Sequence, residues 1–199
     1  MTLETASNYP VYYAVSEDNK IANWRPLVQM LMAIPHLIIA SVLGQVSQVC
    51  TVISWFIILF TGKMPPGLAN FIIMSQRYNA RASGFAFGLT EQYPPFEFDM
   101  TASDPGNYAI RLDINPELED RNRLTVGFRI FMLIPIAIFT AIVFIGVAFV
   151  AFAAWFAVLF TGTYPTGMRN FVIKGSRLSE RVNGYGNLLT DQYPPFELA

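Results

Sequence analysis

Residues 55–97 read WFIILFTGKMPPGLANFIIMSQRYNARASGFAFGLTEQYPPFE, and residues 155–197 read WFAVLFTGTYPTGMRNFVIKGSRLSERVNGYGNLLTDQYPPFE. The two stretches align without a gap at an interval of 100 residues and share 22 identities in 43 positions. Self-similarity at a fixed interval is the signature of a repeated structural unit. We therefore expect two copies of one membrane module, residues 1–100 and residues 101–199.

Each copy also contains a long apolar tract without any Asp, Glu, Lys or Arg. The first tract covers the 37 residues 26–62, and the second covers the 39 residues 130–168. About 20 apolar residues are enough for a helix to cross the roughly 30 Å hydrocarbon core of a bilayer. A chain of 199 residues has too little polar surface to wrap two such tracts inside a soluble core. The sequence therefore predicts a mostly α integral membrane protein.

The length of the tracts leaves two arrangements open. A helix from Arg25 to Gly62 would be about 57 Å long, which exceeds the roughly 30 Å core. Each tract is therefore either one long tilted helix, kinked near Pro35 or Pro135, or a hairpin of two short helices. A single crossing divides the 13 Lys and Arg residues almost evenly between the two sides of the membrane, whereas a hairpin keeps them all on one side. We favour the hairpin for this reason.

Two other kinds of segment flank the tracts. Residues 9–15, 96–100 and 108–114 alternate apolar and polar side chains, which predicts short β-strands of a small extramembrane sheet. In residues 71–89 and 171–189, apolar side chains recur at spacings of three and four beside basic residues. This pattern predicts an amphipathic helix lying in the membrane interface.

The shared motif is an Ile-Pro pair opening the tract, then WF..LFTG..P.G..NF, then R...R, then LT.QYPPF. This pattern resembles the bacterial integral-membrane family catalogued as domain of unknown function number 4389. The resemblance covers residues 9–96 and 108–196. It implies a bacterial membrane protein with no assigned reaction and no catalytic residue to carry over. His36 follows Pro35 in the first copy, but Ile136 stands at that position in the second, which argues against a chemical role for His36.

Composition excludes several classes of function. Hydrophobic residues make up 53% of the chain and charged residues only 14%, with a formal net charge of -1, so the basic surface that nucleic-acid binding needs is missing. The single cysteine, Cys50, and the single histidine, His36, cannot supply a disulfide, a metal cluster or a catalytic triad. No phosphate-binding loop or dinucleotide fingerprint is present. We expect no enzyme activity, no cofactor and no metal.

The candidate site is a pair of arginines four residues apart, which project from one side of a helix and occur in both copies. These arginines are Arg77, Arg81, Arg177 and Arg181. Near a membrane surface, each basic side chain gains about 1 kcal/mol from anionic lipids, so we expect contact with lipid head groups. The alternative is pairing with a nearby carboxylate, such as Glu91 or Asp191.

The remaining candidates are repeated motif positions. They are Trp55, Thr61, Gly62, Tyr93, Pro94, Pro95 and Phe96 in the first copy and Trp155, Thr161, Gly162, Tyr193, Pro194, Pro195 and Phe196 in the second. A tryptophan near the end of each tract fits either an aromatic belt or a packing anchor. The diprolines predict rigid extended segments that end the preceding helix.

We expect a non-catalytic, multi-pass protein of the bacterial inner membrane that serves as an accessory or scaffolding subunit of a larger complex, such as a lipid or solute transporter. Its partners would be the lipid bilayer and other membrane-protein subunits, and not nucleic acid. The alternative is a small stand-alone carrier or channel with its substrate at the repeat interface. A carrier needs polar groups near the membrane midplane in both tracts, and the second tract offers only Thr140 and Gly146 there.

Overall fold

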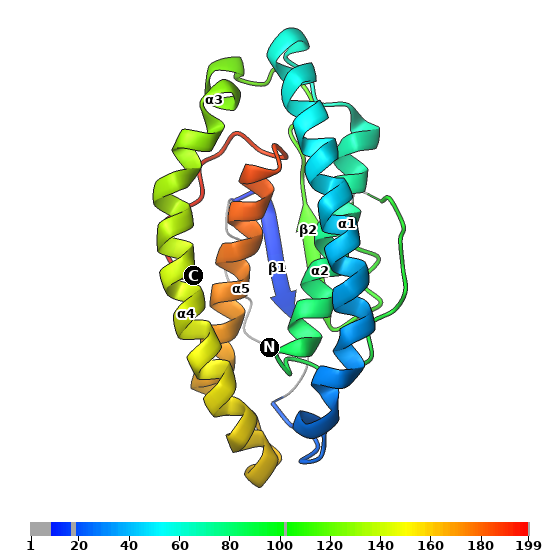
Figure 1. Ribbon diagram of the computed structural model, residues 1–199, viewed down its shortest axis with the longest axis vertical. Helices are drawn as coiled ribbons and strands as arrows, with labels where there is room; N and C mark the ends of the chain where they lie inside the picture. Colours follow the sequence, from blue (N-terminus) through cyan, green and yellow to red (C-terminus); the bar gives the residue numbers. More distant parts are fainter. Residues whose placement is uncertain (1–8, 17–18, 102, 199) are drawn as a thin grey trace.

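The computed structural model describes residues 9–16, 19–101 and 103–198. In chain order, the elements are β1 Val11–Val15, α1 Arg25–Thr61, α2 Pro66–Ala86, β2 Ile110–Ile114, α3 Arg123–Gly127, α4 Arg129–Thr161 and α5 Thr166–Gly186. Each copy of the repeat thus supplies one strand, one long helix and one shorter helix (Figure 1). The mostly helical architecture with a small sheet agrees with the sequence prediction.

Each apolar tract forms one continuous helix, so the favoured hairpin is wrong. Pro35 and Pro135 lie inside α1 and α4 without ending them. The chain turns only at Gly62 and Gly162, which have φ values of 71° and 66°. These left-handed conformations suit glycine because it has no Cβ. The hairpin failed because nothing in the middle of either tract breaks the helix, and Gly44 continues it.

The strand predicted near the start of each copy, in residues 9–15 and in residues 108–114, is confirmed by β1 and β2. β1 and β2 pair antiparallel, with Tyr13 opposite Leu112 at the centre of the register. These two residues hold the same place in the strand segments 9–15 and 108–114, whose interval is 99 residues instead of 100, so the sheet has local two-fold symmetry. The third predicted strand is wrong, because residues 96–100 are described and lie outside both strands.

The two copies interlock. Strand β1 of the first copy packs on α5 of the second, and β2 of the second copy packs on α2 of the first. The backbone N–H of Ile21 donates to the carbonyl of Gly162 at 3.1 Å, and the N–H of Arg121 donates to the carbonyl of Gly62 at 3.0 Å. In Figure 1, α1 and α4 run in opposite directions. The copies are therefore related by a pseudo-two-fold axis that inverts one relative to the other.

The shorter helices α2 and α5 form a middle layer. Each packs against the long helix of its own copy on one side and against a strand of the other copy on the opposite side. On the side of α5 that faces α4, a Cβ at Gly175 would lie 2.4 Å from Cγ2 of Val147. On the side of α2 that faces β2, Arg77 Nε donates to the carbonyl of Leu112 at 3.2 Å. The predicted amphipathic helices are thus present, but they are covered on both faces. The polar side of each helix bonds to the sheet, and the position of these helices in a membrane interface stays a prediction.

The long helices expose apolar side chains along their outer faces. In α1 these are Leu27, Met30, Leu31, Ile34, Ile38, Val42, Val46, Val49, Val52, Ile53, Phe56 and Phe60, and in α4 they are Ile130, Phe131, Ile134, Ile138, Ile142, Ile145, Phe149, Phe152, Phe156 and Phe160. By length and composition, both helices could cross a membrane. Only 22% and 17% of the residues in their most apolar windows are buried. Exposed apolar surface on this scale marks an interaction face.

The packing of β1 on α5 depends on the close approach of Val11 to Gly184. A Cβ there would lie 2.7 Å from Cγ2 of Val11, whose side chain has few rotamers. We expect Gly184→Ala to lower the free energy of unfolding in mild detergent by about 1 kcal/mol, because overpacking outweighs the gain in helix propensity. Gly67→Ala is the control, since nothing lies within 4 Å of its Cβ position. Equal stability of the two variants would contradict the packing argument.

Candidate functional site

The structure buries the arginine pair of the first copy inside the protein. Arg81 bonds to Glu97 at 2.6 Å and to Asp104 at 3.0 Å. Arg77 reaches Asp104 at 3.4 Å and also donates to the carbonyl of Leu112. Only 4% of Arg77 and 3% of Arg81 is exposed. Pairing with a carboxylate, the alternative to lipid contact, is therefore observed, although the carboxylates are not the ones expected.

The second copy repeats this arrangement, with Glu197 in the place of Glu97. Arg181 lies 3.7 Å from Glu197, and its guanidinium is 5.6 Å from the centre of the Tyr9 ring. Arg177 Nε donates to the carbonyl of Tyr13 at 3.1 Å. Tyr13 is the repeat equivalent of Leu112, so each copy sends one arginine to the centre of the other copy's strand. Contact of these arginines with lipid head groups stays a prediction.

The repeated tryptophans join the end of α1 to α3 and the end of α4 to the start of α1. Trp55 Nε1 donates to the carbonyl of Val126 at 2.9 Å, and Trp155 Nε1 donates to the carbonyl of Pro26 at 2.8 Å. The acceptors are again repeat equivalents. This geometry fits the packing anchor, which is one of the two roles that the sequence left open for these tryptophans.

Most other repeated motif positions serve the same framework. The hydroxyls of Thr61 and Thr161 accept from the backbone N–H two residues on, beside the turns at Gly62 and Gly162. Pro94, Pro95, Pro194 and Pro195 lie outside helices and strands. The prediction that they end the preceding helices is wrong, because α2 and α5 already end at Ala86 and Gly186. In the first copy the segment with Pro94 and Pro95 covers α1, because the ring of Phe96 stacks on His36 at 4.4 Å and Tyr93 meets it edge-on at 4.7 Å.

The second copy uses the motif without a histidine. Tyr193 Oη donates to the carbonyl of Met132 at 3.1 Å, and the ring of Phe196 lies 5.5 Å from that of Phe139. In the first copy, His36 is fully buried and its Nδ1 lies 2.8 Å from Tyr78 Oη. The environment of His36 is therefore that of a packed core residue. Cys50 is half-buried and packs beside the hydrophobic core.

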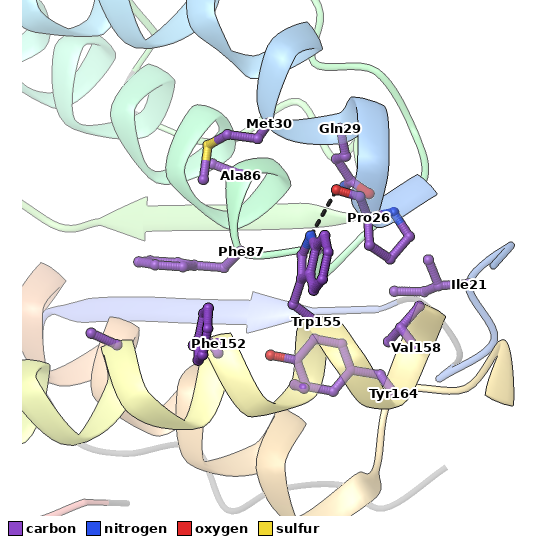
Figure 2. A pocket seen from close by; sticks show the side chains of 14 residues that line it. Ile21, Pro26, Gln29, Met30, Ala86, Phe87, Phe152, Trp155, Val158 and Tyr164 are labelled. Atoms are coloured by element: carbon purple, nitrogen blue, oxygen red, sulfur yellow. Dashed lines mark hydrogen bonds between the residues drawn. The ribbon is translucent and has the colours of Figure 1, made fainter. Parts of the chain in front are cut away.

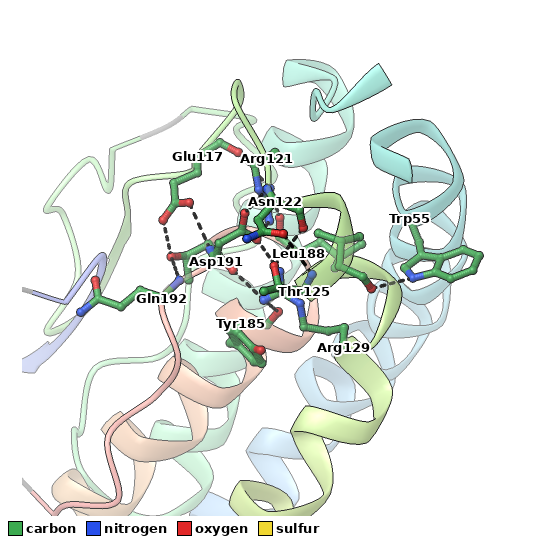
Figure 3. A network of polar contacts seen from close by, with 12 residues as sticks. Trp55, Glu117, Arg121, Asn122, Thr125, Arg129, Tyr185, Leu188, Asp191 and Gln192 are labelled. Atoms are coloured by element: carbon green, nitrogen blue, oxygen red, sulfur yellow. Dashed lines mark hydrogen bonds and ion pairs between the residues drawn. The ribbon is translucent and has the colours of Figure 1, made fainter. Parts of the chain in front are cut away.

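A polar network at the start of α4 was not foreseen from the sequence (Figure 3). Asp191 accepts from Arg121 at 2.7 Å, from the backbone N–H of Asn122 at 2.9 Å, and from Arg129. Burial by itself would raise the pKa of Asp191, but these donors outweigh burial and hold the pKa below its usual value. Nearby, Thr190 donates to Glu117 at 2.6 Å. The network fixes the chain after α5 to the start of α4.

A second unforeseen group is the buried carboxyl of Glu180 in α5. Its Oε2 accepts from Gln76 Nε2 of α2 at 2.8 Å, and only 6% of the residue is exposed. Burial raises the pKa of Glu180 to about 7, and the bond from Gln76 opposes this rise. The first copy has Ala80 at the position of Glu180, and the second copy has Ser176 at the position of Gln76. Because neither residue is repeated, comparison of the copies did not point to this pair.

An apolar cavity of about 440 Å³ lies between the start of α1, the end of α2 and the second half of α4. Figure 2 shows Trp155 in its wall, with Phe87 and Phe152 on one side and Tyr164 beneath. A volume of this size falls in the range of small-molecule sites. Among the described residues, no group of three or more His, Cys, Asp or Glu side chains could hold a metal ion.

Comparison with known proteins gives one match. The family model for a domain of unknown function, DUF4389, matches residues 23–97 and again residues 123–197. No curated protein and no solved structure matches the chain. The two matched segments lie 100 residues apart, which is the interval of the sequence repeat.

The Asp191 network generates a stability prediction. We expect Asp191→Asn to lower the free energy of unfolding by about 3 kcal/mol, because it leaves the buried guanidinium groups of Arg121 and Arg129 without their carboxylate. Denaturation in mild detergent measures this change. Glu119→Gln is the control, since its ion pair with Lys63 is exposed and contributes little. A loss of less than about 1 kcal/mol for Asp191→Asn would show that the network is dispensable.

The Glu180 carboxyl generates a pH prediction. Its pKa is higher in the folded protein than in the unfolded chain, so folding takes up a proton and stability falls as pH rises from about 4.5 to about 7. We expect Glu180→Gln to raise the free energy of unfolding by up to about 3 kcal/mol at about pH 8 and to change it little at about pH 4. Melting temperatures across this pH range test the difference. A stabilisation independent of pH would exclude titration of Glu180 as its cause.

Proposed function

The chain belongs to the DUF4389 family as a tandem pair of its domains, and on that premise we propose that it is a non-catalytic protein of the bacterial inner membrane that acts as an accessory or scaffolding subunit. The observation that carries the proposal is the continuous exposed apolar face of α1 and α4. Leaving a large apolar side chain in water forfeits about 1.5–3 kcal/mol relative to burying it. Twenty-two such side chains on two helices therefore favour a hydrocarbon environment over water.

Three observations favour a membrane helix over the core helix of a soluble protein and over a removable leader. A long apolar helix in the core of a soluble protein is mostly buried, whereas about four fifths of these windows are not. A removable leader would leave the fold intact, whereas α1 packs along α2 and contacts α3 and α4. The same exposed face recurs on α4, in the second copy of the repeat.

We further propose that α1 and α4 lie along the membrane plane, with their apolar faces in one leaflet. The sheet lies beside the middle of the long helices (Figure 1), and Arg111 of β2 is exposed. If both helices stood upright across the bilayer, Arg111 would be near the bilayer centre, where an arginine costs about 2.5–3.5 kcal/mol or more. In the flat arrangement, the sheet layer faces water.

The pairing of the buried arginines supports a non-catalytic accessory role. Arg77, Arg81 and Arg129 are buried and paired within the chain, which makes them part of the framework and not of a reaction centre. The alternative of a stand-alone carrier gains no support from the polar residues of α1. Gln48 and Thr51 contact Asn187 of α5.

Cysteine labelling tests the flat arrangement. Gln92 follows the segment bonded to the start of α1, and Gln192 follows the segment bonded to the start of α4, so these exposed residues lie at opposite ends of the long axis. With Cys50→Ser as background, we expect Gln92→Cys and Gln192→Cys to react with an impermeant maleimide from the same side of sealed membrane vesicles. Val42→Cys, on the apolar face, is the unreactive control.

Labelling of the two positions from opposite sides would show instead that the helices cross the bilayer, as the multi-pass expectation requires. Release of the protein from membranes by alkaline carbonate would contradict membrane embedding altogether. Purification in mild detergent followed by mass spectrometry tests the accessory role. A protein that isolates alone and monodisperse would count against it.

A further inference from the structure

The apolar cavity opens on the apolar face and closes inside the protein. Its mouth is formed by Met30, Ala148 and Phe152, which are exposed side chains of α1 and α4. Its floor includes Val158 and Tyr164, which are 3% and 2% exposed. A molecule could therefore enter from the side that we propose faces the hydrocarbon of the bilayer.

Several of the residues that line this cavity differ from those at the equivalent positions in the other half of the repeat. Three small residues of α4 line it, namely Ala148, Ala151 and Ala154, and the equivalent positions in α1 carry Gln48, Thr51 and Ser54. In the other half, Gln48 Nε2 and Thr51 Oγ1 approach Asn187 Oδ1 at 3.3 Å and 3.5 Å. Gln48 and Thr51 thus make polar contacts at positions where the cavity is lined by the methyl groups of Ala148 and Ala151.

One polar group in the cavity wall has no partner. Gln29 Nε2 donates to the carbonyls of Phe85 and Thr90, and Trp155 Nε1 donates to the carbonyl of Pro26. The hydroxyl of Tyr164 makes no hydrogen bond among the described residues, although it is buried. Figure 2 shows this hydroxyl turned toward Phe152, beneath Trp155. An unsatisfied buried hydroxyl is costly, so a ligand oxygen that accepts its proton would gain affinity.

We propose that the cavity binds one acyl chain, with methylene groups against the apolar wall and a carbonyl or carboxyl oxygen accepting a hydrogen bond from Tyr164 Oη. An apolar site with a single polar group placed to fix orientation is the usual design of a small-molecule pocket. Entry from the bilayer rests on the proposed membrane location, but the binding chemistry does not. Either a free fatty acid or an acyl chain of a phospholipid supplies this chemistry.

Tryptophan fluorescence provides the test, because Trp155 lines the cavity. The chain has three tryptophans, so Trp24→Phe with Trp55→Phe leaves Trp155 as the only reporter. The detergent-solubilised protein is titrated with dibromostearic acid and, separately, with a phosphatidylcholine that carries one brominated acyl chain. We expect quenching that saturates at one ligand per protein for at least one of the two, and the stronger quencher identifies the source of the chain.

Two alanines of α4 supply a matched pair of variants. Ala151→Phe fills the cavity, and we expect it to weaken binding by about tenfold or more. Ala153→Phe makes the same change at an exposed position of α4 outside the cavity lining, and we expect it to leave binding unchanged. Tyr164→Phe should weaken binding by about threefold to tenfold, while the melting temperature without ligand stays equal or rises because an unpaired buried hydroxyl is removed.

Quenching that grows without saturation and is equal in Ala151→Phe and Ala153→Phe would overturn the proposal, since it would reflect only partition into detergent. Vesicle flotation of the same variants separates this inference from the proposed function. Flotation without saturable quenching means that the membrane location holds and the acyl site fails. Saturable quenching without flotation means that the site holds and the membrane location fails.

Discussion

A buried guanidinium group has to be paired, and in this protein one acceptor of each central arginine lies in the other half of the repeat. Arg77 of the first copy bonds to the backbone of Leu112, and Arg177 of the second bonds to that of Tyr13. Breaking a buried charged contact costs several kcal/mol, so separating the halves would remove one stabilising bond from each arginine. The two reciprocal bonds tie each strand to a helix of the other copy. These polar contacts lie in the inner layer, whereas the outer faces of α1 and α4 are apolar.

The sequence predicted those features that repeat or alternate locally. The 100-residue interval, the strands around Tyr13 and Leu112, and the helices that became α2 and α5 were all visible in the residues. The path of the apolar tracts was not, because one long helix and a hairpin of two short helices can have the same charge-free composition. The partners of the arginines could not be predicted from the sequence either. Asp104 lies in the linker and has no second copy, so repetition could not reveal it.

The residues that sequence reasoning missed are those at which the two copies differ. Tyr164 stands where the first copy has Met64, and Glu180 stands where it has Ala80. Comparison of the copies for identity alone hides such positions, although the change from Gln48, Thr51 and Ser54 to three alanines was a signal in the sequence. Conserved positions of the repeat build the common framework, and the divergent positions give each half its own interior.

The register of the sheet has a consequence for single-copy relatives. Because Tyr13 pairs with its own repeat equivalent, a chain with one module could pair its strand with that of an identical chain and regain both arginine contacts. Such a protein would be a symmetric homodimer whose folding depends on its concentration. Fusion of two modules replaces that dependence with a high effective concentration of the partner. It also frees the two halves from identical sequences, so that three alanines line the cavity where the other half carries Gln48, Thr51 and Ser54.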